Sequence, residues 1–315
     1  MGEWTLMKKL TIAIPTYNRQ VLLEKLVNSI PSHLEISISD NGKYLTNEFT
    51  NKYQNVYLIQ HEIIIDIFYN WNSSIKNIKD SDYIAIPSDD DLYATDSFRF
   101  IQDTIDSNEN IDLFIFGNNF IDGNDEIIGQ YCPEEYKIYE APFGLKEFLY
   151  SVDARMPSVF FRKSFLDKIG YFDEEKFTLT AADSELIQRA LLLGKVAFIP
   201  KIVSSYRVWP GSLTDQKIAT KHWMDEIDIW TDKITTIAND TLTKLQNTFD
   251  WDKYKDEIFA RNLLAGMNNL YKNKYYKKVG EHFFTTRYPR NAMIMTKLRI
   301  LKILMFAKIK AFFAA

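Results

Sequence analysis

Residues 83–91 read Tyr-Ile-Ala-Ile-Pro-Ser-Asp-Asp-Asp, an apolar run that ends in three consecutive carboxylates. The apolar run is typical of a buried strand. Three adjacent anions repel one another unless a cation or solvent neutralises them. Carboxylate oxygens are hard ligands, which suit Mg²⁺ or Mn²⁺ that enters together with a diphosphate. The alternative is a solvated turn, because Asp is common in turns for its local hydrogen bonds.

Two more segments place polar residues directly after a short apolar run. Residues 10–15 precede Thr16-Tyr17-Asn18-Arg19, and residues 36–39 precede Asp40-Asn41-Gly42. Between them, residues 21–30 carry apolar side chains at helical spacing, which predicts a strand, helix, strand unit. In open sheets of this kind, ligands bind outside the carboxyl ends of the strands. We therefore expect the three polar segments to converge on one crevice.

The composition fits an enzyme with a substantial core and excludes several other classes. The chain has 315 residues, 46% of them hydrophobic, so one domain plus an appendage is expected. The net charge of −4 gives no reason to expect nucleic acid as a partner. The single cysteine, Cys132, is compatible with a reducing cytoplasm, and none of the four histidines has zinc-ligand spacing to another. Residues 1–7 contain no secretory signal and are expected to be a leader.

The ordered set of motifs resembles the inverting family 2 glycosyltransferases with the GT-A fold. The residues that carry the resemblance are 12–19, 39–42, 83–91, 160–163, 170–173 and 182–185, followed by Arg189 and Gly194. The resemblance implies an α/β fold, Rossmann-like, with a mixed central sheet flanked by helices. It covers residues 8–215, which we expect to form the transferase domain. Beyond it, the helical periodicity predicts a helical appendage over residues 216–290.

By this resemblance, the polar segments form a donor site for a nucleotide-sugar, most simply a UDP-sugar. Asp40 resembles the aspartate that contacts uracil, although Asp-Asn-Gly is also a strong turn signal in its own right. Arg19 is expected near the phosphates, the alternative being a surface residue at a helix start. The residues expected to bind the nucleotide are Pro15, Thr16, Tyr17, Arg19, Asp40, Asn41 and Asp89. Mn²⁺ or Mg²⁺ is expected at Asp90, with Asp91 next, and would stabilise the leaving diphosphate.

Inverting transfer also needs a base that deprotonates the acceptor hydroxyl. Asp183 matches the second residue of the family's Glu-Asp motif, whereas the first is Ala182 here. Glu185 is the substitute base, and the alternative for Asp183 is a helix N-cap. Two short strands are expected at residues 197–200 and 203–207. The loop that follows offers Arg207 as a diphosphate contact and Trp209, which replaces a common histidine and could stack on a sugar or pack under the loop.

The last segment, residues 291–315, has five lysines and arginines and no acidic residue. Its longest apolar run is too short to span a bilayer, which predicts a basic amphipathic helix lying on an anionic membrane surface. The alternative is a helix packed on the domain with its lysines in water.

The sequence therefore predicts a cytoplasmic enzyme, peripheral on the cell membrane, that builds a bacterial surface glycan such as a capsule or lipopolysaccharide. The acceptor would be a glycan or a lipid-linked glycan. Three alternatives remain. A nucleotidyltransferase usually has a Gly-rich loop after its first strand, which residues 15–19 lack. A glycoside hydrolase uses two carboxylates but needs no metal triplet. A non-catalytic glycan- or partner-binding relative would explain Ala182 and Trp209.

Overall fold

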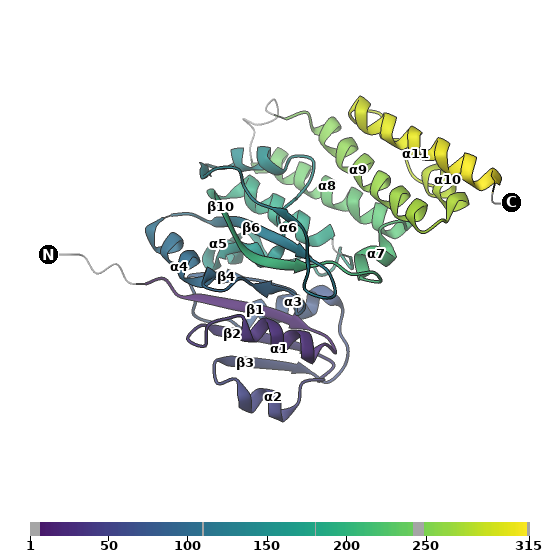
Figure 1. Cartoon of the computed structure of the whole chain (residues 1–315). Coiled ribbons are helices and arrows are strands. Elements are labelled where there is room, and N and C mark those ends of the chain that lie inside the picture. The colour runs from purple at the N-terminus through teal and green to yellow at the C-terminus, as the bar shows by residue number, and fades with distance from the viewer. Residues whose placement is uncertain (1–6, 109, 180, 242–248, 314–315) are drawn as a thin grey trace. The chain divides into compact units, whose positions relative to one another are not determined.

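The computed structural model of the chain describes residues 7–108, 110–179, 181–241 and 249–313, which belong to two compact units (Figure 1). Most of the predicted leader, residues 1–6, lies outside the described residues, as do 242–245 and 314–315 of the predicted C-terminal helices. The first unit comprises Met1–Glu147, Val152–Thr178 and Ala190–Val208. The second comprises Phe148–Ser151, Leu179–Arg189 and Trp209–Ala315.

The first unit is built on a mixed sheet, which in the described part of the chain has ten strands. The strands are β1 (Leu10–Thr16), β2 (Glu35–Asn41), β3 (Val56–His61), β4 (Tyr83–Ala85), β5 (Leu92–Tyr93), β6 (Leu113–Ile121), β7 (Ile127–Tyr131), β8 (Lys137–Tyr139), β9 (Val159–Arg162) and β10 (Val196–Arg207). Their order is β3-β2-β1-β4-β9-β6-β10-β5, with β7 paired to β6 and β8 to β10. The predicted α/β fold with a mixed sheet is confirmed.

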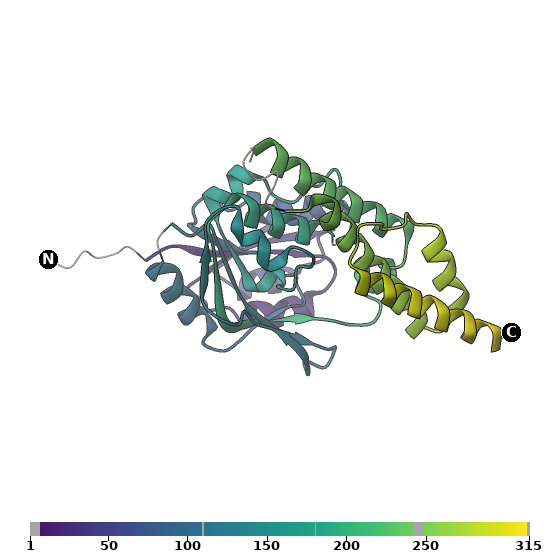
Figure 2. The same ribbon diagram turned by 90° about the horizontal axis from the view of Figure 1, so that it is seen from above.

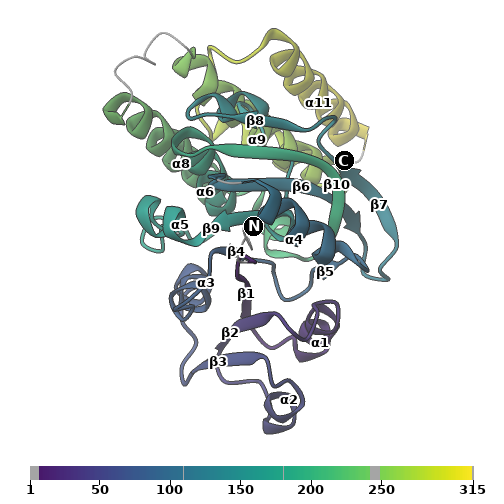
Figure 3. The same cartoon turned by 90° about the vertical axis from the view of Figure 1, so that its left-hand side faces the viewer.

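Helices cover both faces of this sheet, as Figure 3 shows with α3 and α5 on one face and α1 and α4 on the other. The helices that lie wholly in this unit are α1 (Gln20–Asn28), α2 (Asn47–Lys52), α3 (Ile67–Lys76), α4 (Ser97–Ser107) and α5 (Lys163–Ile169), with the short 3₁₀ turn η2 (Met156–Ser158). The helix α6 (Ala181–Leu193) and the 3₁₀ turn η1 (Phe143–Phe148) contain residues of both units. Ile12 and Ile14 of β1 are fully buried in one core cluster with Leu26 of α1 and Ile101 of α4. The near-continuous apolar run of β1 is what a strand covered on both faces requires.

The strand ends explain why the polar segments meet. β1 lies between β2 and β4 and is parallel to both, so the three carboxyl ends lie at the same edge of the sheet. Thr16 at the end of β1 is in register with Asp40 of β2. The Asp triplet follows β4 at the same edge.

One predicted boundary in this unit is wrong. Residues 197–200 and 203–207 are not two strands but parts of β10, which pairs with β6 along both halves and shifts register between Phe198 and Ile202. Pro200 lies within this shift. Proline cannot donate to the ladder, so it disturbs the pairing locally without ending the strand.

The second unit is largely helical. It includes α7 (Leu213–Lys217), α8 (Lys221–Thr241), α9 (Trp251–Lys272), α10 (Tyr276–Phe284) and α11 (Ile294–Phe313). α9 packs against α8, α10 and α11, and the last three helices lie side by side in Figures 1 and 2. Asp250 begins α9 by accepting a hydrogen bond from the Lys253 N–H (2.9 Å). Within the described residues, every helix is too short or too polar to cross a membrane.

Candidate active site

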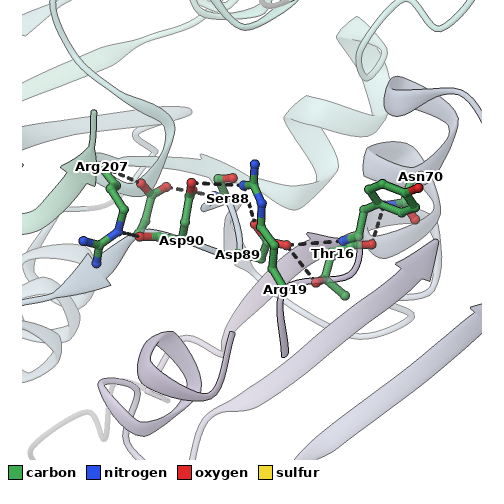
Figure 4. A network of polar contacts seen from close by, with 9 residues as sticks. Thr16, Arg19, Asn70, Ser88, Asp89, Asp90 and Arg207 are labelled. Carbon is green, nitrogen blue, oxygen red and sulfur yellow. Dashed lines mark hydrogen bonds and ion pairs between the residues drawn. The ribbon is translucent and has the colours of Figure 1, made fainter. Parts of the chain in front are cut away.

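The first carboxylate of the triplet joins the ends of two strands. Thr16 Oγ1 and the Tyr17 N–H both donate to Asp89 Oδ2, at 2.8 and 3.3 Å. Arg19 Nη1 lies 3.2 Å from Asp89 Oδ1. Figure 4 shows this arrangement, in which Asp89 holds the loop after β1 against the loop after β4.

The second carboxylate shares the same arginine. Arg19 Nη1 lies 3.0 Å from Asp90 Oδ2, so one guanidinium bridges two adjacent carboxylates (Figure 4). Asp90 as a residue is only 7% exposed, whereas the Arg19 side chain is 40% exposed. The other oxygen, Asp90 Oδ1, has no hydrogen-bond partner among the described residues. Asp90 therefore keeps one oxygen available to a ligand.

The third carboxylate is bound to the backbone. The Ser88 N–H donates to Asp91 Oδ2 (2.8 Å), and the Arg207 N–H donates to Asp91 Oδ1 (3.3 Å). Asp91 is 1% exposed. Both of its oxygens thus hold main chain in place, and any metal bound by Asp91 would have to share them.

We expect Asp91→Asn to lower the free energy of unfolding by about 1–3 kcal/mol, because an amide nitrogen cannot accept and one buried N–H would lose its partner. Urea denaturation measures this change. Asp90→Asn is the matched control and should stay within about 0.5 kcal/mol, because the one hydrogen-bond and ion-pair partner of the Asp90 side chain among the described residues is the half-exposed Arg19. Equal losses in both variants would contradict the structural role of Asp91.

Asp40 and Asn41 shape the loop after β2. Asp40 is fully buried, and its carboxylate accepts from the N–H groups of Tyr44 (3.1 Å) and Leu45 (2.8 Å). Asn41 exchanges two hydrogen bonds with the backbone of Ile65, at 2.8 and 2.9 Å. The Asp-Asn-Gly turn exists but makes no hairpin, because the chain continues through α2 to the parallel strand β3.

Arg207 is a buried arginine that braces the triplet. Its Nε donates to the Asp90 carbonyl (2.8 Å) and its Nη1 to the Asp122 carbonyl (2.8 Å), while Nη2 lies 2.5 Å from Asp125 Oδ1. Only 1% of its side chain is exposed. All three guanidinium nitrogens have protein partners, which weighs against a direct diphosphate contact.

Asp183 belongs to the second unit. α6 begins at Ala181, so Asp183 lies in the first helical turn and the alternative of a helix N-cap is wrong. Its Oδ1 accepts from the Ser184 N–H (2.6 Å), and the residue is half-buried. A carboxylate in the first turn of a helix interacts favourably with the helix dipole.

Glu185, the substitute base, is completely buried in the same unit. Its two oxygens lie 2.8 and 2.9 Å from Arg189 Nε and Nη2, and Lys233 Nζ lies 3.5 Å away. Both carboxylate oxygens are engaged in this buried ion pair, which weighs against a role of Glu185 as a base. Trp209 is half-buried, and its carbonyl accepts from the Ser212 N–H (3.3 Å) in the turn before α7.

Solved structures reveal what this architecture is similar to. S. aureus TarS 1–349 in complex with UDP-GlcNAc matches with a TM-score of 0.62 and 18% identity, over 96% of this chain and 88% of that one. The complex of TarS 1–349 with UDP matches with a TM-score of 0.59 and 18% identity, over 96% and 87%. The chain has the fold of TarS. A longer TarS structure matches with a TM-score of 0.60 and 16% identity, and the chain spans 53% of its length.

The predicted GT-A-like fold is thereby confirmed through TarS. Comparison of the amino-acid sequence alone finds no such similarity. No protein-family model matches it. No curated protein is significantly similar to it either.

The charge balance at the edge of this TarS-like sheet favours a cation. Burial, followed by repulsion from Asp90, raises the pKa of Asp89 to about 6, although Arg19 acts in the opposite direction. The same two causes raise the pKa of Asp91 well above its usual range. No group of three or more His, Cys, Asp or Glu side chains among the described residues is arranged as a preformed metal site. The unpartnered Asp90 Oδ1 nevertheless fits a metal that takes its remaining ligands from a diphosphate and water.

Sequence reasoning predicted Tyr17 as a nucleotide-binding residue but missed Tyr44, which packs against it. The rings of Tyr17 and Tyr44 meet edge to face at 5.4 Å between centroids, and both residues are more than a third exposed, at 46% and 40%. Gly42 makes their approach possible: its φ of +92° suits glycine, and a Cβ there would meet the Tyr44 ring at 2.7 Å. The position of Tyr44 just after the Asp-Asn-Gly turn was the available signal.

Proposed function

We propose that the chain is a metal-dependent inverting glycosyltransferase of family 2, which transfers a sugar from a UDP-sugar to a hydroxyl of a glycan or lipid-linked glycan. One observation carries the proposal: Asp89 and Asp90 are held under Arg19 where β1 and β4 end, in the fold of TarS. TarS has been crystallised with UDP-GlcNAc and with UDP, and these complexes support a nucleotide-sugar donor.

In this proposal, Asp90 is the direct ligand of Mn²⁺ or Mg²⁺, and Asp91 comes second because its oxygens already serve the backbone. When bound, the metal would stabilise the negative charge that grows on the leaving diphosphate. Arg19 adds a positive charge at the same place, and its half-exposed side chain can turn from Asp90 toward a phosphate. Asp89 and Thr16 keep the two loops together.

The base of the nucleotide would lie by Tyr17 and Tyr44. Asp40 accepts a hydrogen bond from the Tyr44 N–H and so fixes the backbone there. The carboxylate that resembles the family's uracil-binding aspartate would therefore also orient the Tyr44 ring. Pro15 lies within β1 and Asn41 ends β2, and these residues would support the pocket through the main chain.

Asp183 is the proposed general base, which removes the proton from the acceptor hydroxyl as the hydroxyl attacks.

The test is calorimetric titration with UDP, GDP, dTDP and CDP, each with Mn²⁺ and again with EDTA. We expect UDP to bind most tightly and EDTA to remove most of the affinity, since the metal joins the diphosphate to Asp90. If none of the four nucleotides binds in the presence of Mn²⁺, the proposal is wrong and a glycan- or partner-binding protein becomes the better description.

We expect Tyr44→Ala to weaken UDP binding by about 5- to 100-fold, because stacking of a base on an aromatic ring contributes about 1–3 kcal/mol. Calorimetry with Mn²⁺ present measures the change in Kd. Tyr57→Ala is the control: Tyr57 is a similarly exposed tyrosine on β3, at 55%. If the Kd is unchanged in Tyr44→Ala, or changes equally in both variants, the uracil base does not bind at Tyr44.

A further inference from the structure

The C-terminal helix α11 has two apolar faces, and only one of them is covered. Thr296, Ile300, Ile303, Leu304 and Ala307 are buried, at the spacing of a single helix face. This face packs against α9 and α10 within the second unit (Figures 1 and 2). The alternative of a packed helix is therefore right for this half of α11.

The opposite face is apolar and open. Its side chains recur at helical spacing and are between 46% and 79% exposed: Ile294, Leu298, Leu301, Met305, Ile309 and Phe312. Exposed large apolar side chains are ordinary when scattered, but a continuous stripe along a whole helix marks an interaction surface. We call this stripe the open face of α11.

Positive charges border the open face on both sides. At 3.6 residues per turn, Lys297 and Lys308 fall along one edge of the stripe. On the other side, the exposed Met295, Phe306 and Phe313 widen the stripe past Lys302, and Arg299 and Lys310 border it there. No acidic residue occurs between Asn291 and Ala315. Lys308 Nζ also lies 5.8 Å from the ring of Phe284 on α10, which is 68% exposed and adds apolar surface beside this edge.

We propose that the open face of α11 docks on an anionic lipid bilayer, with its apolar stripe among the acyl chains and its lysines at the headgroups. An apolar face with basic edges is the pattern by which helices lie in a membrane interface. The positive edges argue against a second copy of the chain as the occupant, because such a contact would bring like charges together. α11 lies on rather than across the bilayer, since no described helix is apolar enough to cross it.

The test is co-sedimentation of the full chain with vesicles, without any nucleotide, so it is independent of the proposed transferase activity. Vesicles of phosphatidylglycerol and phosphatidylcholine in equal parts are compared with vesicles of phosphatidylcholine alone. We expect binding to the anionic vesicles that is weakened by salt. Lys308→Gln and Lys310→Gln should each reduce this binding by roughly fivefold.

The decisive variant is Leu298→Asn/Met305→Asn, which removes apolar surface from the open face. We expect it to bind anionic vesicles at least about tenfold more weakly. Ile127→Asn/Ile128→Asn is the matched control and should bind normally, because it changes two exposed apolar residues of β7. Unchanged melting temperatures would show that both variants fold.

Three results would overturn the proposal. One is no sedimentation with anionic vesicles at low salt. Another is equal binding by Leu298→Asn/Met305→Asn and the unchanged chain. The third is concentration-dependent self-association, measured by analytical ultracentrifugation, that Leu298→Asn/Met305→Asn abolishes while no vesicle binds, because the occupant would then be a second copy.

Discussion

Replacing Asp183 with asparagine is expected to lower kcat by about 10²–10⁴-fold, the range that a positioned general base contributes. Asparagine has nearly the same shape, and its carbonyl can still accept the Ser184 N–H, so α6 should begin as before. It cannot take a proton from the acceptor hydroxyl. The measurement is the release of UDP from the bound UDP-sugar, with the Kd for UDP determined in parallel by calorimetry.

The separation of these two quantities makes the test specific. A base affects the chemical step and not the binding of the nucleotide, so the Kd for UDP should be unchanged while kcat falls. The control is Asp225→Asn, which makes the same change at an exposed carboxylate of α8. A normal kcat in Asp183→Asn would remove Asp183 from the mechanism and leave its first-turn position as its explanation.

The polar residues at the edge of the sheet could be predicted because the local sequence of each strand end shows where the strand stops. The apolar runs of β1, β2 and β4 end where polar residues begin, and parallel strands carry those ends to one edge. Thr16, Asp89 and Asp90 follow directly from this pattern. The same local logic predicted helices over most of the second unit, because their apolar residues recur at helical spacing.

The sequence could not reveal hydrogen bonds between residues that are far apart in the chain. Arg207 looked like a phosphate ligand because it is a cation at a strand end. In the structure its side chain is buried and donates to the carbonyls of Asp90 and Asp122, more than eighty residues away in the chain, and these bonds weigh against a direct contact with a phosphate. Main-chain carbonyls have no sequence signature, so a buried arginine of this kind cannot be told from a ligand-binding one.

The predicted start of α6 was wrong for a related reason. The apolar periodicity of α6 is clear only from Leu186, and this suggested that Asp183 precedes the helix. Ala181 and Ala182 extend the helix by a turn, because alanine has the highest helix propensity and needs no amphipathic pattern to adopt it. The periodicity locates a packed face and not the first residue of a helix.

Asp90→Asn is expected to lower kcat/KM for the UDP-sugar by roughly 10³-fold, since a metal at the leaving group supplies several kcal/mol of charge stabilisation in the transition state. The variant should fold normally. Arg19 keeps its contact with Asp89 (3.2 Å), and the Asp91 bonds to the backbone are untouched. The measurement is UDP release over a series of Mn²⁺ concentrations.

The dependence on Mn²⁺ distinguishes a metal ligand from a residue that only positions Arg19. Loss of a ligand should raise the Mn²⁺ concentration needed for half-maximal activity, and excess Mn²⁺ should recover part of the rate. Loss of a positioning contact should lower the rate equally at every Mn²⁺ concentration. Asp103→Asn removes an exposed carboxylate from α4 in the same unit and should change neither quantity. If Asp90→Asn keeps the normal Mn²⁺ dependence, Asp90 is no ligand; the metal then belongs to Asp91, and the backbone N–H groups of Ser88 and Arg207 must share its oxygens.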